Sequence, residues 1–148
     1  MFLSVFDLFK LSVGPSSSHT MGPMIAAKRF ADGVAGGALP EGDLAVECHL
    51  YGSLAYTGEG HGTFRAVLCG LLGLAPESYD RDAADAALAQ LAERRRVTIG
   101  GRDLRLDPEA GIVAERGKRL QKHPNALEFR LRNAGGTVVL GETYYSVG

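Results

Sequence analysis

Cysteine, net charge and long apolar runs are all scarce in this chain, and each scarcity excludes a class of protein. Only Cys48 and Cys69 occur among 148 residues, too few for a disulfide framework, which favours a reducing compartment. Sixteen basic and 17 acidic residues leave no excess charge to attract nucleic acid or an anionic membrane. No apolar run approaches the roughly 20 residues of a membrane span. We therefore expect a cytoplasmic protein with neither nucleic acid nor membrane as a partner.

We also expect neither a leader sequence nor a linker within these residues. Residues 1–14 place Asp7 and Lys10 inside an apolar run, without a basic flank or a small-residue cleavage site, so no signal peptide is expected. There is no internal repeat and no low-complexity stretch. A chain of this length can bury a real core, and we expect a single domain over residues 1–148.

A run of hydroxyls and one imidazole, GPSSSHT at residues 14–20, comes directly before an amphipathic segment. Apolar side chains then recur at helical spacing, at Met24, Ala27, Ala31 and Val34. Pro23 fits the first turn of this helix, and Gly33, Gly36 and Gly37 are expected to end it. Free backbone amides and the positive end of the helix dipole make this an anion site, and the missing lysine favours a small carboxylate over a triphosphate. The alternative is a Ser/Thr-rich helix cap with an incidental histidine.

A second segment, residues 51–63, is rich in glycine and carries His61. Glycines at 58, 60 and 62 allow sharp turns and close approach to a ligand. A helix is predicted to follow, with Phe64, Val67, Leu68 and Leu71 at helical spacing and Gly73 after its end. A histidine held at such a helix start could abstract a proton near neutral pH. The alternative is a histidine in a flexible loop.

His123, Pro124 and Asn125 precede a strand-like run. Proline keeps His123 extended, so the polar side chains of His123 and Asn125 could project from the end of a sheet. By itself this is an ordinary turn; beside the other two segments it is a candidate gate or substrate-recognition element. The remaining histidine, His49, alternates to the polar face of a predicted strand and is interpreted as structural.

The rest of the chain predicts an α+β fold, with helices packed on one face of a mainly antiparallel sheet. Residues 43–51 and 127–131 alternate as half-buried strands, and the Gly135-Gly136 turn leads into a strand over 137–145. Residues 82–96 predict a helix, and short strand-like runs follow within 97–122. The three arginines at 94–96 could suggest an RNA patch, but at a helix C-terminus they are more often complements to the dipole.

Taken together, these motifs resemble the iron–sulfur L-serine dehydratases, the bacterial L-serine ammonia-lyases. The segments that carry the resemblance are residues 4–10, 14–24, 50–55, 58–63, 123–125 and 143–148, in the same order. The resemblance spans essentially the whole chain but covers only the amino-terminal, or β, domain of that family. It also implies a likeness to the allosteric substrate-binding domains of phosphoglycerate dehydrogenases.

The resemblance implies conversion of L-serine to pyruvate and ammonia, with a [4Fe–4S] cluster whose open iron acts on the substrate hydroxyl. Cys48 and Cys69 share no ligand-like spacing and fall in apolar patterns, so both are expected to be buried apolar residues. We expect this chain to bind no cluster and to provide no metal ligand. The cluster would be held by a carboxyl-terminal α domain, in the same or a partner chain. The chain alone is therefore expected to be inactive, and a homo-oligomer is expected.

The resemblance assigns roles to the candidate site residues. His61 would be the general base, with Thr63 positioning it or the substrate. The substrate-binding set is Ser16, Ser17, Ser18, His19, Thr20, His123 and Asn125. The loops at 14–20 and 60–63 are then predicted to meet at one edge of the sheet, with His123 nearby, in a shallow open pocket.

Two further hypotheses stay open. One is a non-catalytic module that binds serine or a related amino acid and regulates an attached catalytic domain, for which a proton-abstracting histidine has no use. The other is a dimerisation domain without a ligand, in which the two loops would lie apart.

Overall fold

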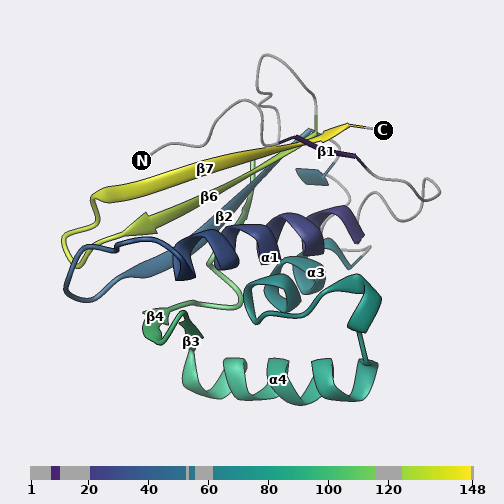
Figure 1. The fold of residues 1–148 in the computed structure, drawn as a ribbon, viewed down its shortest axis with the longest axis horizontal. Coiled ribbons are helices and arrows are strands. Elements are labelled where there is room, and N and C mark those ends of the chain that lie inside the picture. Colours follow the sequence, from purple (N-terminus) through teal and green to yellow (C-terminus); the bar gives the residue numbers. More distant parts are fainter. Residues whose placement is uncertain (1–7, 11–20, 53, 56–61, 116–124, 148) are drawn as a thin grey trace.

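One sheet organises the molecule, and β2 runs through its middle (Figure 1). The structure is a computed structural model that describes residues 8–10, 21–52, 54–55, 62–115 and 125–147. Within these residues the helices are α1 (Met21–Ala35), α3 (Thr63–Leu71), the 3-10 turn η2 (Pro76–Ser78) and α4 (Arg81–Arg94). The strands are β1 (Leu8–Lys10), β2 (Ala45–Tyr51), β3 (Arg96–Ile99), β4 (Arg102–Arg105), β5 (Ile112–Ala114), β6 (Ala126–Arg132) and β7 (Val138–Val147).

The strand order is β1-β7-β6-β2-β4-β3, and β5 also pairs with β2. The long pairings, β2 with β6 and β6 with β7, are antiparallel, as is the β3–β4 hairpin. Parallel pairings are short: β1 with β7, β2 with β5, and a single pair between β2 and β4. The predicted α+β fold with a mainly antiparallel sheet is confirmed.

The helices cover one face of this sheet. Figure 1 shows α1 lying along the long strands, with α3 beside it and α4 farther away. At the centre of the core Phe30 of α1 stacks on Phe129 of β6, with ring centroids 4.8 Å apart. Tyr144 of β7 meets Phe129 edge-on at 5.8 Å. Such aromatic pairs add about 0.5–1.5 kcal/mol beyond the burial of their area, so they fix α1 on β6 and β7.

The predicted helices are confirmed, with differences at their ends. The first continues through Gly33 and ends at Ala35, because a single glycine costs a helix only about 1 kcal/mol relative to alanine and does not by itself end it. Helix α4 begins at Arg81, after Asp80 accepts a hydrogen bond from the Ala83 amide at 2.9 Å. It ends at Arg94, because Arg95 adopts a left-handed conformation with φ 55° that turns the chain into β3.

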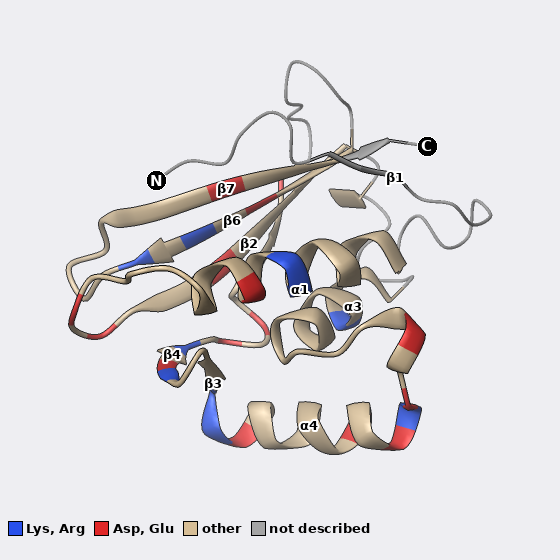
Figure 2. Ribbon diagram, viewed as in Figure 1, with Lys and Arg blue, Asp and Glu red and all other residues tan. Residues whose placement is uncertain are grey.

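Charges of both signs are mixed along the elements (Figure 2). In the run of three arginines, Arg95 is ion-paired with Asp107 at 3.2 Å, and Arg96 with Asp103 at 2.6 Å. Arg95 and Arg96 thus belong to a group of ion pairs around β3 and β4. The longest helix in the described part of the chain, α1, has 15 residues, and no helix there has both the length and the apolarity that a bilayer crossing needs.

Candidate functional site

The three segments that carry the predicted site residues all attach to the same end of the sheet. Tyr51, the last residue of β2, pairs with Ala126, the first residue of β6. On the other side of β2, Ala114 at the end of β5 pairs with Leu50. Strand β1 runs parallel to the end of β7, which itself lies beside the start of β6. The described residues before 11–20, before 56–61 and on both sides of 116–124 therefore lie at the same end of the sheet.

At the N-termini of α1 and α3 the surface is hollowed. The hollow has a volume of about 300 Å³. It contains Met21, which follows the hydroxyl run directly, and Gly62, which follows His61 directly. Gly62 has φ 82°, a left-handed conformation that glycine adopts at little cost, and it caps α3. The other described residues of its lining are Met24, Arg65, Ala66, Cys69, Pro76 and Tyr79.

One cation, Arg65, lies among the described residues of this mainly apolar hollow. Its guanidinium donates a hydrogen bond to the Tyr79 hydroxyl at 2.9 Å and contacts Asp85 at 2.6 Å. These hydrogen bonds raise the pKa of Arg65 above its already high ordinary value. The side chain is thus a permanent positive charge in the first turn of α3, with its donors directed to Tyr79 and Asp85.

Of the predicted site residues, Thr63 and Asn125 lie within the described part of the chain. Thr63 is the first residue of α3 and is fully buried. Asn125 is half-buried and stands directly before β6. The others lie outside the described residues: Ser16, Ser17, Ser18, His19, Thr20, His61 and His123. Their roles stay predictions.

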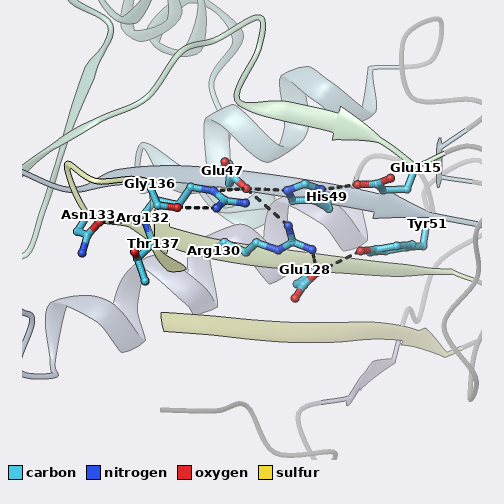
Figure 3. Close-up of polar contacts among 10 residues, drawn as sticks. All are labelled: Glu47, His49, Tyr51, Glu115, Glu128, Arg130, Arg132, Asn133, Gly136 and Thr137. Atoms are coloured by element: carbon cyan, nitrogen blue, oxygen red, sulfur yellow. Dashed lines mark hydrogen bonds and ion pairs between the residues drawn. The ribbon is translucent and has the colours of Figure 1, made fainter. Parts of the chain in front are cut away.

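Sequence reasoning gave no functional weight to a polar network on the outer face, meaning the face of the sheet opposite α1 and α3. His49 on β2 is only 6 % exposed, and both of its ring nitrogens meet carboxylates (Figure 3). Its Nδ1 lies 2.7 Å from Glu115 Oε2, and its Nε2 lies 2.8 Å from Glu47 Oε1. The alternation of β2 correctly predicts the face of His49, but Glu115 is 66 residues away and no local pattern indicates it.

The network continues onto β6. Arg132 contacts Glu47 at 3.0 Å and donates to the Gly136 carbonyl in the hairpin turn at 2.8 Å. Beside this row, Tyr51 donates a hydrogen bond to Glu128 at 3.1 Å, and Arg130 contacts the same carboxylate at 2.7 Å. Figure 3 shows the contacts as a row from the β6–β7 turn to the end of β5. Polar links therefore span the sheet from its turn to the end where the site segments attach.

The two cysteines do not fit an iron–sulfur cluster. Cys48 is fully buried on β2, where burial raises the pKa of its thiol well above the ordinary value. Cys69 is buried in a different cluster of core residues, between α1 and α3, and burial raises its pKa as well. Among the described residues no three His, Cys, Asp or Glu side chains are grouped so that they could hold a metal ion. A cysteine binds iron as a thiolate, which is favoured by surroundings that lower the pKa of the thiol, whereas burial raises it at both of these cysteines.

Comparison with known proteins decides the family. The model of the serine dehydratase beta chain family matches residues 4–148. This chain belongs to the serine dehydratase beta chain family. The match includes all three segments of the candidate site.

Complete relatives are similar over the whole of this chain. An L-serine dehydratase of Streptomyces coelicolor is 42% identical over 149 residues, covering 100% of this chain and 33% of the relative. An L-serine dehydratase of Mycobacterium tuberculosis is 41% identical over 156 residues, with 100% and 32% covered. L-serine dehydratase 1 of Escherichia coli is 37% identical over 148 residues, with 99% and 32% covered. The chain thus spans about a third of the length of the curated relatives it matches.

Proposed function

We propose that this chain is the β domain of an L-serine ammonia-lyase, which converts L-serine to pyruvate and ammonia. In this proposal a [4Fe–4S] cluster is held by a domain outside these 148 residues. Membership of the serine dehydratase beta chain family supports the proposal. The observation that carries the site is the hollow shared by Met21 and Gly62, because each directly follows a segment with predicted site residues.

The hydroxyl run is proposed to bind the substrate carboxylate. Residues 14–20 end where α1 begins, next to its first amides, which have no partner within the helix, and the helix dipole is positive at that end. Hydroxyls of Ser16, Ser17, Ser18 and Thr20, with the His19 ring, supply further donors. Neutral donors bind a carboxylate without the strong attraction that a triphosphate would need. His123 and Asn125 are proposed to recognise the remainder of the amino acid.

His61 is proposed to remove the α-proton of serine. That proton is weakly acidic because the adjacent carboxylate already carries a negative charge, so the base needs donors that stabilise the charge as it forms. The amides at the start of α1 and the hydroxyl run provide such donors in this arrangement. Buried Thr63, two residues after His61, is proposed to hold the base in place.

A pair of substitutions in the full-length protein tests the assignment. His61→Ala is expected to lower kcat by about 10²–10⁴-fold with little change in serine binding, because a general base acts mainly in the transition state. Ser16→Ala or Ser18→Ala is expected mainly to raise KM, because a carboxylate contact is similar in ground and transition states. Steady-state pyruvate formation measures both, and exchange of the serine α-hydrogen with deuterated water measures the proton step alone.

The control is the visible absorbance of the iron–sulfur cluster, which must be equal in all variants. Near-normal turnover and α-hydrogen exchange in His61→Ala would show that another residue is the base. If His61→Ala instead abolished activation by serine while leaving the proton step unchanged, the chain would be a regulatory serine-binding module.

A further inference from the structure

His49 sits where a polar residue on an outer sheet face would ordinarily be solvated. Its side chain is only 8% exposed and lies between Glu47 on its own strand and Glu115 just beyond β5. Both ring nitrogens lie within hydrogen-bond distance of a carboxylate oxygen, so the ring joins two side chains that are far apart in the sequence. Two contacts made by one buried ring hold their partners in one geometry more firmly than an exposed pair does.

The two carboxylates stand at different places in the fold. Glu47 lies within the body of β2, where Arg132 and, more distantly, Arg130 also contact it. Glu115 lies at the end of β5, and its amide donates to the Leu50 carbonyl at 2.8 Å. It is the last described residue before 116–124, the segment that leads to His123 and Asn125. The Nδ1 contact therefore ties the first stem of that segment to β2.

The second stem is tied to the same strand. Tyr51 pairs with Ala126, the residue after Asn125, and its hydroxyl donates to Glu128 on β6. Both stems of the segment are thus fixed to the last residues of β2, one by its His49 and the other by its Tyr51. The residues that follow β2 in the chain lead to the segment that carries His61.

We propose that His49 is a positioning residue for the substrate site, acting through its Nδ1 contact with Glu115. Together with the backbone pairing of β5 and β2, the contact holds the stem of the segment carrying His123 and Asn125 at the end of β2. Glu47 contacts the other ring nitrogen from the body of the sheet, and the contact with Glu115 does not depend on it. This inference rests on the proposed function, because its effect is seen in serine recognition.

Two substitutions at His49 separate positioning from simple loss of the ring. In H49N the amide nitrogen is bonded to Cγ, as Nδ1 is, so it can still donate to Glu115. In H49Q the nitrogen is one bond farther out, toward Glu47. In the full-length protein with its cluster, KM for L-serine is expected to stay within about twofold in H49N and to rise about tenfold in H49Q, because a change that weakens recognition contacts alone raises KM. The kcat is expected to stay within about threefold in both, because recognition contacts act alike in ground and transition states.

A second matched pair uses the two carboxylates. E115A removes the contact at the stem, and E47A removes the contact in the body of the sheet while leaving the stem in place. We expect about a tenfold higher KM in E115A and an unchanged KM in E47A, with thermal unfolding recorded for both. This pair decides the proposal if the His49 variants fail to fold.

Equal KM values for H49N and H49Q, or a rise in E47A that matches E115A, would overturn the positioning role and leave a purely structural network. The wild-type protein is measured first. If it neither binds nor converts L-serine, the proposed function fails; if it does and the matched pairs behave alike, only this inference fails.

Discussion

Glu47 and Tyr51, four residues apart on the same face of β2, have their pKa values shifted in opposite directions. Burial alone would raise the pKa of Glu47, but hydrogen bonds from His49 and Arg132 outweigh it and lower the pKa below its ordinary 4.5. Burial and the neighbouring Glu128 carboxylate raise the pKa of Tyr51 to about 12, because both disfavour the phenolate. At neutral pH Glu47 is thus an ionised acceptor, and Tyr51 remains a hydrogen-bond donor to Glu128.

The lowered pKa of Glu47 makes its contribution to stability depend on pH. A carboxyl group whose pKa is lower in the folded than in the unfolded state stabilises the protein above the unfolded pKa, near 4.5, and loses that contribution as pH falls through the folded pKa. Relative to wild type, E47Q is expected to lose about 1.5 kcal/mol of unfolding free energy at pH 7, at the low end for charged hydrogen bonds. The difference should shrink below pH 4.5 and vanish in stronger acid.

Urea unfolding of both proteins from pH 3 to pH 7 measures this difference. The control is D32N, which removes an exposed pair with Lys28 in α1 and should cost about 0.5 kcal/mol or less at pH 7. A difference for E47Q that is constant from pH 3 to pH 7 would contradict the role of the charge.

At the scale of elements, the closeness of α1 and α3 decides how their N-termini share one hollow. Gly70 in α3 faces α1 so closely that a Cβ there would overlap the Met24 carbonyl oxygen and lie 2.6 Å from the Ala27 Cβ. Both obstacles are parts of α1 that cannot rotate away. A side chain at position 70 would therefore push the helices apart, and with them Met21 and Gly62.

Gly70→Ala is expected to destabilise the protein by about 1–3 kcal/mol through overpacking, although alanine is the better helix former by about 1 kcal/mol. Gly33→Ala in α1 is the matched control, because nothing lies within 4 Å of its Cβ position. It should be neutral or stabilising by up to about 1 kcal/mol. Thermal unfolding of the two variants checks both signs. Equal effects would show that helix propensity, rather than contact between α1 and α3, sets the result.

At the scale of the whole molecule, local periodicity predicts much of the fold, and long-range pairing accounts for what it misses. The starts of α1 and α3 and the buried face of β2 follow from apolar spacing, which is local. The parallel pairing of β5 with β2 and the contact of His49 with Glu115 join residues more than 60 positions apart, and such pairings leave no local pattern. The early end of α4 depends on Arg95 adopting a positive φ, which arginine seldom does.

The candidate site likewise has features that local motifs predict and features that depend on long-range packing. Hydroxyls, glycines and histidines indicate its chemistry because each motif is contiguous, and the shared end of the sheet follows once the strand order is known. The hollow with Met21 and Gly62 needed the packing of two helices, which motifs alone do not give.

This chain matches only about a third of each relative's length, so the proposed activity depends on residues outside it. The chain has a continuous core from α1 to β7, yet it spans a third of the relatives' length, and its two cysteines are buried apart. We expect the 148-residue chain to unfold cooperatively but to form no pyruvate from L-serine. Adding the remaining two thirds as a separate, cluster-loaded chain should restore turnover, whereas a His61→Ala version of this chain should bind that partner without restoring it. Pyruvate from the iron-free chain alone would contradict the prediction, because the proposed base and carboxylate donors would then suffice without a cluster.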